Sequence, residues 1–436
     1  MTAHRGARRV RLASGTAALV LFAVQAAAQS SAPGQRAAQS LFGPGRSQTA
    51  REVTLDWWST LFAAYDGRRE PAAAGTAPRS IYFVADESVT FGRRGDSISF
   101  GGFTRAELRK YRGADEPIKP GVTGLAWFEA GLGARLKLRA LGAYRDTPLR
   151  LAGLLPEDPG TGLGLDAGVD VTPIESLALT RHRVVSRMGA LEAAYDVTPL
   201  TRLTAFVQQR RSDAEEGARH DMRRVGAQIA RHLSAHTQLV IGYALRRLDR
   251  LDIAERTDSH DLNVGIDYHR ALSFTRRTTL AFHTGSAILR REHGTSLRAI
   301  GEATIRREFR RSWAAEGGYS RRVLFLEGFE QPAFADSATF NVSGLLTRRL
   351  DVALSARYAV GEIGLAVRSN PFDLAMATAR LRWSVGSHVA LFVRGGYFYY
   401  EFQDNAGLPP GLARVLNRPT AQAGVSLWVP FLDNGR

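Results

Sequence analysis

The charged side chains of this sequence recur at every second position within otherwise apolar runs. In the stretch GARLKLRALGAY, Leu136 and Leu138 alternate with Arg135, Lys137 and Arg139. Because the side chains of an extended strand point alternately to its two faces, this spacing places the charges on one face. The same phase of the other runs carries Arg246, Asp267, His269, His283, Arg298, Glu302, Arg306, Glu316, Arg357, Arg380, Arg382 and Arg394.

This charged face has two interpretations. Arginines that outnumber the acids would form a basic lining that attracts anions or acidic sugars. Alternatively, arginine and carboxylate side chains on neighbouring strands would pair and fill the interior. The two interpretations are compatible, and the sequence leaves both open.

The sequence offers no pattern that predicts catalysis or a cofactor. It has ten histidines but no HExxH or other metal-ligand spacing, and it has neither GxSxG nor a phosphate-binding loop. We expect His269 and His283 to be polar lining rather than metal ligands. The absence of cysteine excludes thiol catalysis and cysteine-ligated metal. We therefore predict a protein that is not an enzyme and needs no cofactor.

The apolar positions of these runs predict the fold. In HDLNVGIDYHRAL, Leu262, Val264, Ile266 and Tyr268 alternate with polar residues, which fits a strand between lipid and water as well as one in a soluble sheet. From Val53 onward, runs of about ten to fourteen residues are separated by breaks that alternate between short and long. A β-propeller would instead show a blade-length repeat and turns of uniform length. We predict an all-β chain that forms one up-and-down antiparallel transmembrane β-barrel of about 18 strands, within a range of 16–20.

The N-terminus predicts export. Residues 1–28 combine a basic start, a short apolar core and Ala26-Ala27-Ala28, which is typical of a cleaved signal peptide; a retained anchor is the alternative. Residues 29–50 read as a flexible periplasmic lead-in, and 51–436 as a barrel in the bacterial outer membrane. Removal of the four leader arginines lowers the net charge from +16 to +12. The expected partners are lipid and an anionic solute, and export argues against nucleic acid.

Aromatic residues supply a second indication of a membrane. Seven tyrosines occur on the apolar phase near predicted strand ends, as in an aromatic girdle, although tyrosine is also common in ordinary strands: Tyr65, Tyr144, Tyr195, Tyr268, Tyr358, Tyr397 and Tyr399. Trp58, Trp127, Trp383 and Trp428 are predicted on the lumen phase, where they would stack on sugars or fill the interior near the rims.

Two segments depart from the simple pattern. Residues 145–184 form the longest predicted loop, which would either fold inward and narrow the pore or be disordered. Glu87 shares the apolar phase of Ile81, Phe83 and Val89, where a charge facing lipid is unfavourable. We expect a bulge or register change that removes Glu87 from that face.

Several stretches resemble a family of bacterial outer-membrane β-barrels similar to the integral, porin-like barrels associated with exopolysaccharide secretion. They are VTLDWWSTLFAAYDGR, SVTFGRRGDSISFGGF, GLLTRRLDVALSARYAVGEIG and YFYYEFQDNAGLPPGLARVLNRPTAQAGVSLWVPF. The resemblance implies polysaccharide export, with a periplasmic polysaccharide-export protein as partner. Two alternatives are a general porin for small solutes and a non-transporting barrel for structure or adhesion.

Overall fold

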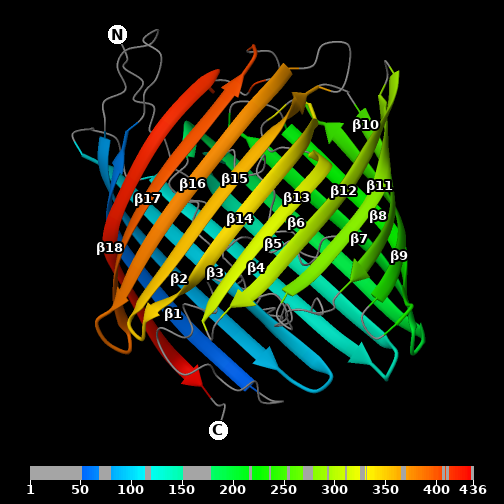
Figure 1. The fold of residues 1–436 in the computed structure, drawn as a ribbon, viewed down its shortest axis with the longest axis horizontal. Coiled ribbons are helices and arrows are strands. Elements are labelled where there is room, and N and C mark those ends of the chain that lie inside the picture. Colours follow the sequence, from blue (N-terminus) through cyan, green and yellow to red (C-terminus); the bar gives the residue numbers. More distant parts are fainter. Residues whose placement is uncertain are drawn as a thin grey trace, which may run out of the picture.

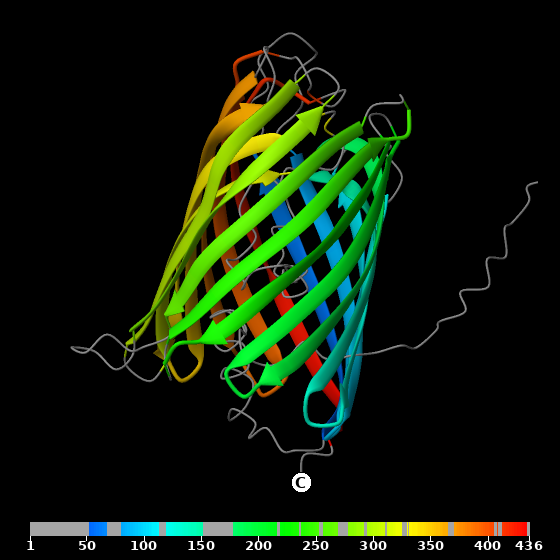
Figure 2. The same cartoon turned by 90° about the vertical axis from the view of Figure 1, so that its right-hand side faces the viewer.

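The chain folds into a closed antiparallel barrel whose wall, in the described part of the chain, is an 18-stranded sheet (Figure 1; Figure 2). This computed structural model describes residues 52–67, 80–112, 119–150, 178–215, 219–234, 237–252, 256–268, 278–291, 294–309, 312–324, 329, 331–364, 370–404, 408 and 412–433. The predicted signal peptide, the lead-in and His269 therefore lie outside the described residues.

Each strand pairs with its neighbours in sequence, and β1 pairs with β18 to close the ring. The first nine strands are β1 (Glu52–Asp66), β2 (Ser80–Arg94), β3 (Ile98–Tyr111), β4 (Lys119–Leu132), β5 (Leu136–Arg150), β6 (Ala178–Thr198), β7 (Thr201–Ala214), β8 (Arg219–His232) and β9 (Thr237–Arg250). The remaining strands are β10 (Arg256–Tyr268), β11 (Thr278–Arg291), β12 (Gly294–Phe309), β13 (Trp313–Leu324), β14 (Ala333–Thr347), β15 (Leu350–Ile363), β16 (Asn370–Ser384), β17 (Val389–Phe402) and β18 (Val415–Asp433). The predicted fold class and strand number are thus confirmed.

The two rims of the barrel differ in the length of their connections. At one rim, which we call the turn end, strands are joined by short segments such as 133–135, 199–200 and 348–349. At the other, the loop end, most connections are longer, for example 67–79, 325–332 and 403–414. Two connections break the rule, since 292–293 at the loop end is short and 269–277 at the turn end is long. Short turns are periplasmic and longer loops extracellular in outer-membrane barrels, which orients the chain.

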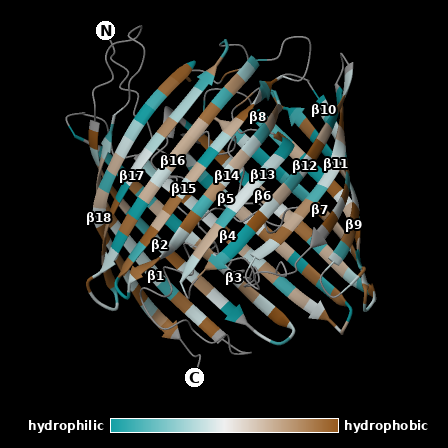
Figure 3. Ribbon diagram, in the orientation of Figure 1, coloured by the Kyte–Doolittle hydropathy of each residue, from teal (hydrophilic) through white to brown (hydrophobic). Residues whose placement is uncertain are grey.

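The outer face of the wall is apolar. Leu61 and Tyr65 of β1 are exposed, as are Ile81 and Phe83 opposite them on β2, whereas the alternate side chains Phe62 and Tyr82 are buried. Apolar residues recur along the strands in Figure 3. A closed sheet satisfies every backbone hydrogen bond without water, so such a face can contact lipid. The protein is therefore an integral outer-membrane barrel. None of the described residues forms a helix long and apolar enough to span a membrane.

The structure places five of the seven predicted girdle tyrosines on this outer face with exposed side chains, namely Tyr65, Tyr144, Tyr195, Tyr358 and Tyr397. Tyr399 occupies the same phase, half-buried, with its hydroxyl donating to Glu401 at 2.5 Å. Tyr268 ends β10 opposite Thr237, and its side chain lies outside the described residues. In the same strand, Leu262 and Val264 are exposed on the outer face, as expected.

The prediction of a bulge or register change at Glu87 was wrong. The register between β1 and β2 is continuous, with Ser59 opposite Glu87, so the carboxylate stays on the outer face at the middle of β2. Trp57 donates its indole N–H to Oε2 of Glu87 at 2.8 Å, and Ser59 donates its hydroxyl to Oε1 at 2.6 Å. Two neighbouring donors therefore satisfy the carboxylate in place of a change in backbone register.

A buried ion pair lies at the seam where the barrel closes. Arg418 of β18 donates two hydrogen bonds, of 2.7 and 2.5 Å, to the two carboxylate oxygens of Asp66 at the end of β1. The side chains are only 1% and 5% exposed, so each charge depends on the other for solvation. This bidentate pair fixes the register at the loop end of the seam.

We predict that Arg418→Gln lowers the free energy of unfolding by about 3–5 kcal/mol, because it leaves the Asp66 carboxylate buried without its partner. Urea unfolding in detergent micelles, followed by heat-modifiable gel mobility, measures the change. The control is Arg202→Gln, which removes a 2.6 Å pair with Asp196 whose arginine is 48% exposed and should cost at most about 1 kcal/mol. Equal losses in both variants would contradict the role of the seam pair.

Candidate functional site

The face opposite the lipid lines the lumen, and it carries most of the charged residues singled out from the sequence. The strand register places there Lys137, Arg139, Arg246, His283, Arg298, Glu302, Arg306, Glu316, Arg357, Arg380, Arg382 and Arg394. Asp267 lies in β10 opposite Gln238, but its side chain, like the whole of His269, is outside the described residues.

Arg135 is the one described member of this set that the structure places elsewhere. It lies in the turn 133–135, with an exposed side chain, and its carbonyl accepts a hydrogen bond from the N–H of Asp196 at 2.8 Å. Gly133 has a φ of 69°, which permits the tight reversal before β5 begins at Leu136. The prediction failed because the alternating pattern of the sequence extends into the turn, where the backbone is no longer a strand.

Near the turn end, cross-strand ion pairs fill the lumen face. Arg139 lies 3.1 Å from Glu129 and 3.5 Å from Glu192, on the strands at either side of β5. Arg382 donates to Asp351, which also lies 3.9 Å from Arg380. Arg306 and Glu316, at 3.9 Å, and His283 and Glu302, at 3.7 Å, repeat the arrangement. In this half of the barrel arginines pair with carboxylates on neighbouring strands, as one of the two interpretations of the sequence predicts, although Arg380 and Arg382 share the single carboxylate of Asp351.

The tryptophans of the turn end pack together rather than lining an open surface. The rings of Trp58 and Trp428 lie 6.0 Å apart, and the indole N–H of Trp428 donates to Asp56 at 3.2 Å. Trp127 also lies on the lumen face, opposite Leu141. Trp383 was wrongly expected there: it is 50% exposed on the outer face, because Arg382 beside it in β16 points into the lumen.

Nearer the loop end, the balance of charge changes. Arg224 of β8 and Arg246 of β9 are directly opposite one another, and Asp261 of β10 is the neighbouring carboxylate. Arg246 donates to Asp261 at 3.0 Å, and Ser259 donates to the other oxygen of that carboxylate at 2.7 Å. Arg224 instead stacks on Phe206, with its Cζ 5.1 Å from the ring centroid. Its Nε has no hydrogen-bond partner among the described residues.

This basic cluster therefore holds two guanidinium groups and one carboxylate. The sequence analysis identified Arg246 but missed Arg224, Asp261 and Phe206. The signal for Arg224 was present, since Met222, Arg224 and Gly226 alternate with Arg223 and Val225. Because Arg223 and Arg224 are adjacent, the alternating pattern did not indicate which of these two side chains points into the lumen.

The tip of the β13–β14 hairpin bends over the lumen beside this cluster. Arg246 donates to the carbonyl of Val323 at 3.2 Å, although β9 and β13 are separated by three strands in the wall. Val323 and Phe334 pack against Ala287 and Leu289 on β11. The contact is possible only if the hairpin leaves the wall and crosses part of the interior. The lumen is therefore narrower at this level than the strand number alone implies.

Arg298 of β12 holds this hairpin at a second point. Its guanidinium lies 2.5 Å from Glu362 at the end of β15, and its Cζ is 5.1 Å from the centroid of Phe334. Arginine over an aromatic ring is favourable when partly desolvated, as here. The hairpin tip is thus fixed by a carbonyl, a ring and a carboxylate.

The opposite part of the lumen wall is apolar. Phe372, Leu374, Phe398, Tyr400 and Phe402 form a buried cluster on the lumen face of β16 and β17. Phe329 and Leu412, from the connections after β13 and β17, are buried members of the same cluster. The loop end of the lumen therefore has a basic side on β8–β12 and a packed apolar side on β14–β18.

Other chemistry at the site is limited. Within the described ranges, no three His, Asp or Glu side chains are grouped as a metal site would require. At the loop-end mouth, Arg250 donates to Asp252 at 2.7 and 3.4 Å, and this hydrogen bonding lowers the pKa of Asp252. The carboxylate at the mouth is therefore charged at neutral pH. The predicted loop 145–184 is shorter than expected, because β5 extends to Arg150 and β6 starts at Ala178; residues 151–177 lie outside the described part.

Comparisons with known proteins found similar barrels among solved structures. Acinetobacter baumannii OccAB4 has a TM-score of 0.45 and 10% identity, with 86% of this chain and 98% of that chain covered. Pseudomonas aeruginosa OccK2 (OpdF) in complex with glucuronate has a TM-score of 0.45 and 11% identity, with 87% and 98% covered. Pseudomonas aeruginosa OpdQ has a TM-score of 0.43 and 10% identity, with 87% and 99% covered. No family model and no curated protein matches the sequence.

We predict that Arg298→Gln loosens the hairpin tip, because it removes the charge that contacts both Glu362 and Phe334. Amide hydrogen exchange of a peptide spanning residues 319–338 should accelerate by about tenfold or more, the effect of losing one charged hydrogen bond. Arg306→Gln is the matched control, since it lies on the same face of the same strand but contacts Glu316 near the start of β13, away from the hairpin tip. Unchanged exchange in Arg298→Gln would show that the hairpin does not depend on this contact.

Proposed function

We propose that this barrel is a passive outer-membrane channel for small polar solutes and that it favours anions. The observation that carries the proposal is the basic cluster, where Arg246 pairs with Asp261 and Arg224 stacks on Phe206 beside the inward-bent hairpin. A solute that passes this level must exchange part of its hydration for contact with the wall. Fixed guanidinium groups lower that cost for an anion and raise it for a cation.

The arrangement of the two sides supports a guided path rather than a uniform pore. At the loop end, the basic cluster and Arg298 lie on β8–β12, and the packed apolar cluster lies on β14–β18. Arginine presents several N–H donors in a planar fork that suits carboxylate and phosphate groups. The solute class that fits this lining is therefore a small molecule with an acidic group. No covalent bond is made or broken in such a passage.

Polysaccharide export, which the sequence resemblance implies, fits the described lumen less well. A hydrated chain would need a continuous wide path, whereas the inward-bent hairpin, with the carbonyl of Val323 3.2 Å from Arg246, occupies part of the lumen. Export would also require a periplasmic partner, whereas a small-solute channel conducts by itself. A non-transporting barrel would conduct in neither case. Conduction by the purified protein alone therefore separates a small-solute channel from the other two functions.

We predict anion selectivity for the full-length protein in a planar bilayer under a KCl gradient. Arg224→Gln combined with Arg246→Gln should lower the chloride-to-potassium permeability ratio by at least about sevenfold, the effect on one ion of removing two unit charges at about 7 Å in water. The selectivity should weaken in concentrated salt, which screens the lining.

The matched control is Arg93→Gln combined with Arg307→Gln, which removes two arginines from the outer face near the turn end. Its permeability ratio should equal that of the unmodified protein. A ratio that favours potassium before any substitution would contradict the proposal. So would an unchanged ratio in the Arg224 and Arg246 double variant.

A further inference from the structure

Charged residues form ordered rows on the outer face of β6–β11 at the loop end. One row, read across neighbouring strands, consists of Arg187, Arg211, Asp221, Asp249 and Arg256. The next row toward the turn end contains Gln209, Arg223, Arg247, Asp258 and Arg290. All of these side chains share the phase of the exposed apolar residues, so they project away from the lumen.

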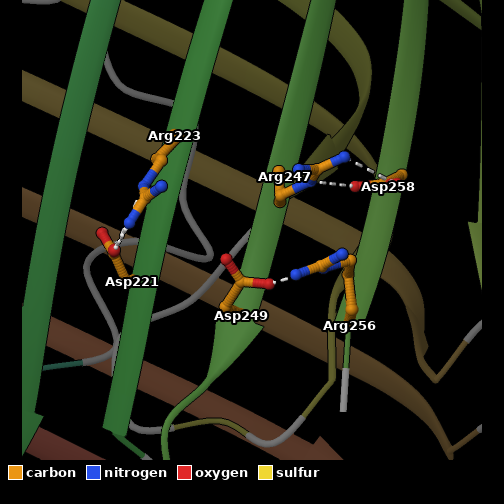
Figure 4. Close-up of polar contacts among 6 residues, drawn as sticks. All are labelled: Asp221, Arg223, Arg247, Asp249, Arg256 and Asp258. Atoms are coloured by element: carbon orange, nitrogen blue, oxygen red, sulfur yellow. Dashed lines mark hydrogen bonds and ion pairs between the residues drawn. The ribbon is translucent and has the colours of Figure 1, made fainter. Parts of the chain in front are cut away.

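Three arginine–aspartate ion pairs lie at the centre of these rows (Figure 4). The N–O distances are 2.8 Å for Arg223–Asp221, 2.9 Å for Arg247–Asp258 and 2.8 Å for Arg256–Asp249. In each pair the arginine is the more exposed partner, at 61%, 40% and 57% against 10%, 26% and 23% for the aspartates. The carboxylates thus lie beneath guanidinium groups that keep free N–H donors on the outside.

Two further arginines extend this surface beyond the pairs. Arg187 and Arg290 are exposed, and in the described part of the chain neither forms an ion pair. The six arginines Arg187, Arg211, Arg223, Arg247, Arg256 and Arg290, which we call the outer arginine patch, therefore exceed their four neighbouring aspartates, which are Asp221, Asp249, Asp258 and Asp213, the last of them 3.5 Å from Arg211. The patch keeps a net positive charge after its internal pairing.

The position of the patch along the membrane normal follows from the neighbouring row on its turn-end side. Val207 and Val225, two residues nearer the turn end than Gln209 and Arg223, are 47% and 51% exposed on the same face. Two residues of strand correspond to about 7 Å. The patch thus begins directly where the apolar belt ends, on the extracellular side, at the level of the lipid headgroups of the outer leaflet.

The arginines of the patch lie on one side of the barrel. On β14–β17 at the loop end, the outer face carries Asp336, Asp373 and Glu401 instead. Three outer-face tyrosines donate hydroxyl hydrogen bonds to these acids, from Tyr319 to Asp336, from Tyr358 to Asp373 and from Tyr399 to Glu401. If the arginines were exposed only because long side chains reach the headgroup level, they would occur on both sides of the barrel and would not be replaced by acids on β14–β17.

We propose that the outer arginine patch binds the phosphate groups of the phosphorylated glycolipid of the outer leaflet. Arginine binds phosphate oxygens bidentately, and this contact is stronger at the edge of a membrane than in bulk water. Arg223 and Arg247 are directly opposite on neighbouring strands, so one phosphate can bridge them. Rows on five adjacent strands suit a headgroup with more than one phosphate. The patch is separate from the lumen, and its role does not depend on the proposed channel.

The test uses the full-length protein in detergent, titrated with bis-phosphorylated lipid A and followed by native mass spectrometry. Dephosphorylated lipid A and phosphatidylglycerol are the comparison lipids. The unmodified protein should bind bis-phosphorylated lipid A at least about tenfold more tightly than either. Arg187→Gln combined with Arg290→Gln, which disrupts no ion pair of the described residues, should weaken that binding by about twenty-five-fold, from a contribution of about fivefold per arginine.

Adding Arg223→Gln and Arg247→Gln should remove the preference for phosphate. Arg93→Gln combined with Arg307→Gln makes the same charge change on the outer face of the turn end and should leave lipid A binding unchanged. Heat-modifiable mobility confirms that each variant is folded. Equal binding of phosphatidylglycerol and lipid A would overturn the glycolipid assignment. Unchanged lipid A binding in the Arg187 and Arg290 variant would overturn the patch itself.

Discussion

The pairing of β1 with β18 is the constraint on which the rest of this structure depends. In lipid, an open sheet edge would leave a row of N–H and C=O groups without partners, at a cost of several kcal/mol for each group. Closure removes that edge, and the paired segment runs from Thr54 to Asp66 on β1. One irregularity, between Leu55 and Asp56, is absorbed near the turn end, while Arg418 and Asp66 fix the loop end. Everything else follows from a wall that has one face in lipid and one toward water.

This division explains why the fold was predictable from the sequence and why details of the site were not. Alternation reports which face a residue occupies, and it located the strands and most of the lumen charges. It does not report where a strand ends, so Arg135 was placed in a strand although it lies in a turn. It also does not report contacts between distant strands. The inward bend of the β13–β14 hairpin arises from Arg246, Arg298 and Phe334, whose proximity no sequence spacing encodes.

The exceptions to the pattern are resolved by local partners. Glu87 remains on the lipid side because Trp57 and Ser59 satisfy its carboxylate, which a count of apolar positions could not foresee. In the lumen, both interpretations of the arginines apply, but at different depths. Near the turn end, residues such as Arg139 are held between acids on neighbouring strands. Near the loop end, Arg246 pairs with Asp261 while Arg224, directly opposite Arg246, stacks on Phe206, and a positive charge is left beside the inward-bent hairpin.

The central claim is that the barrel alone passes small polar solutes and favours anions. Swelling of liposomes that contain the purified full-length protein tests it most directly, with gluconate, glucose and glucosamine as solutes of similar size and different charge. The account predicts swelling in all three, fastest for gluconate and slowest for glucosamine, with the difference reduced in high salt. Absence of swelling, or fastest swelling in glucosamine, would contradict it.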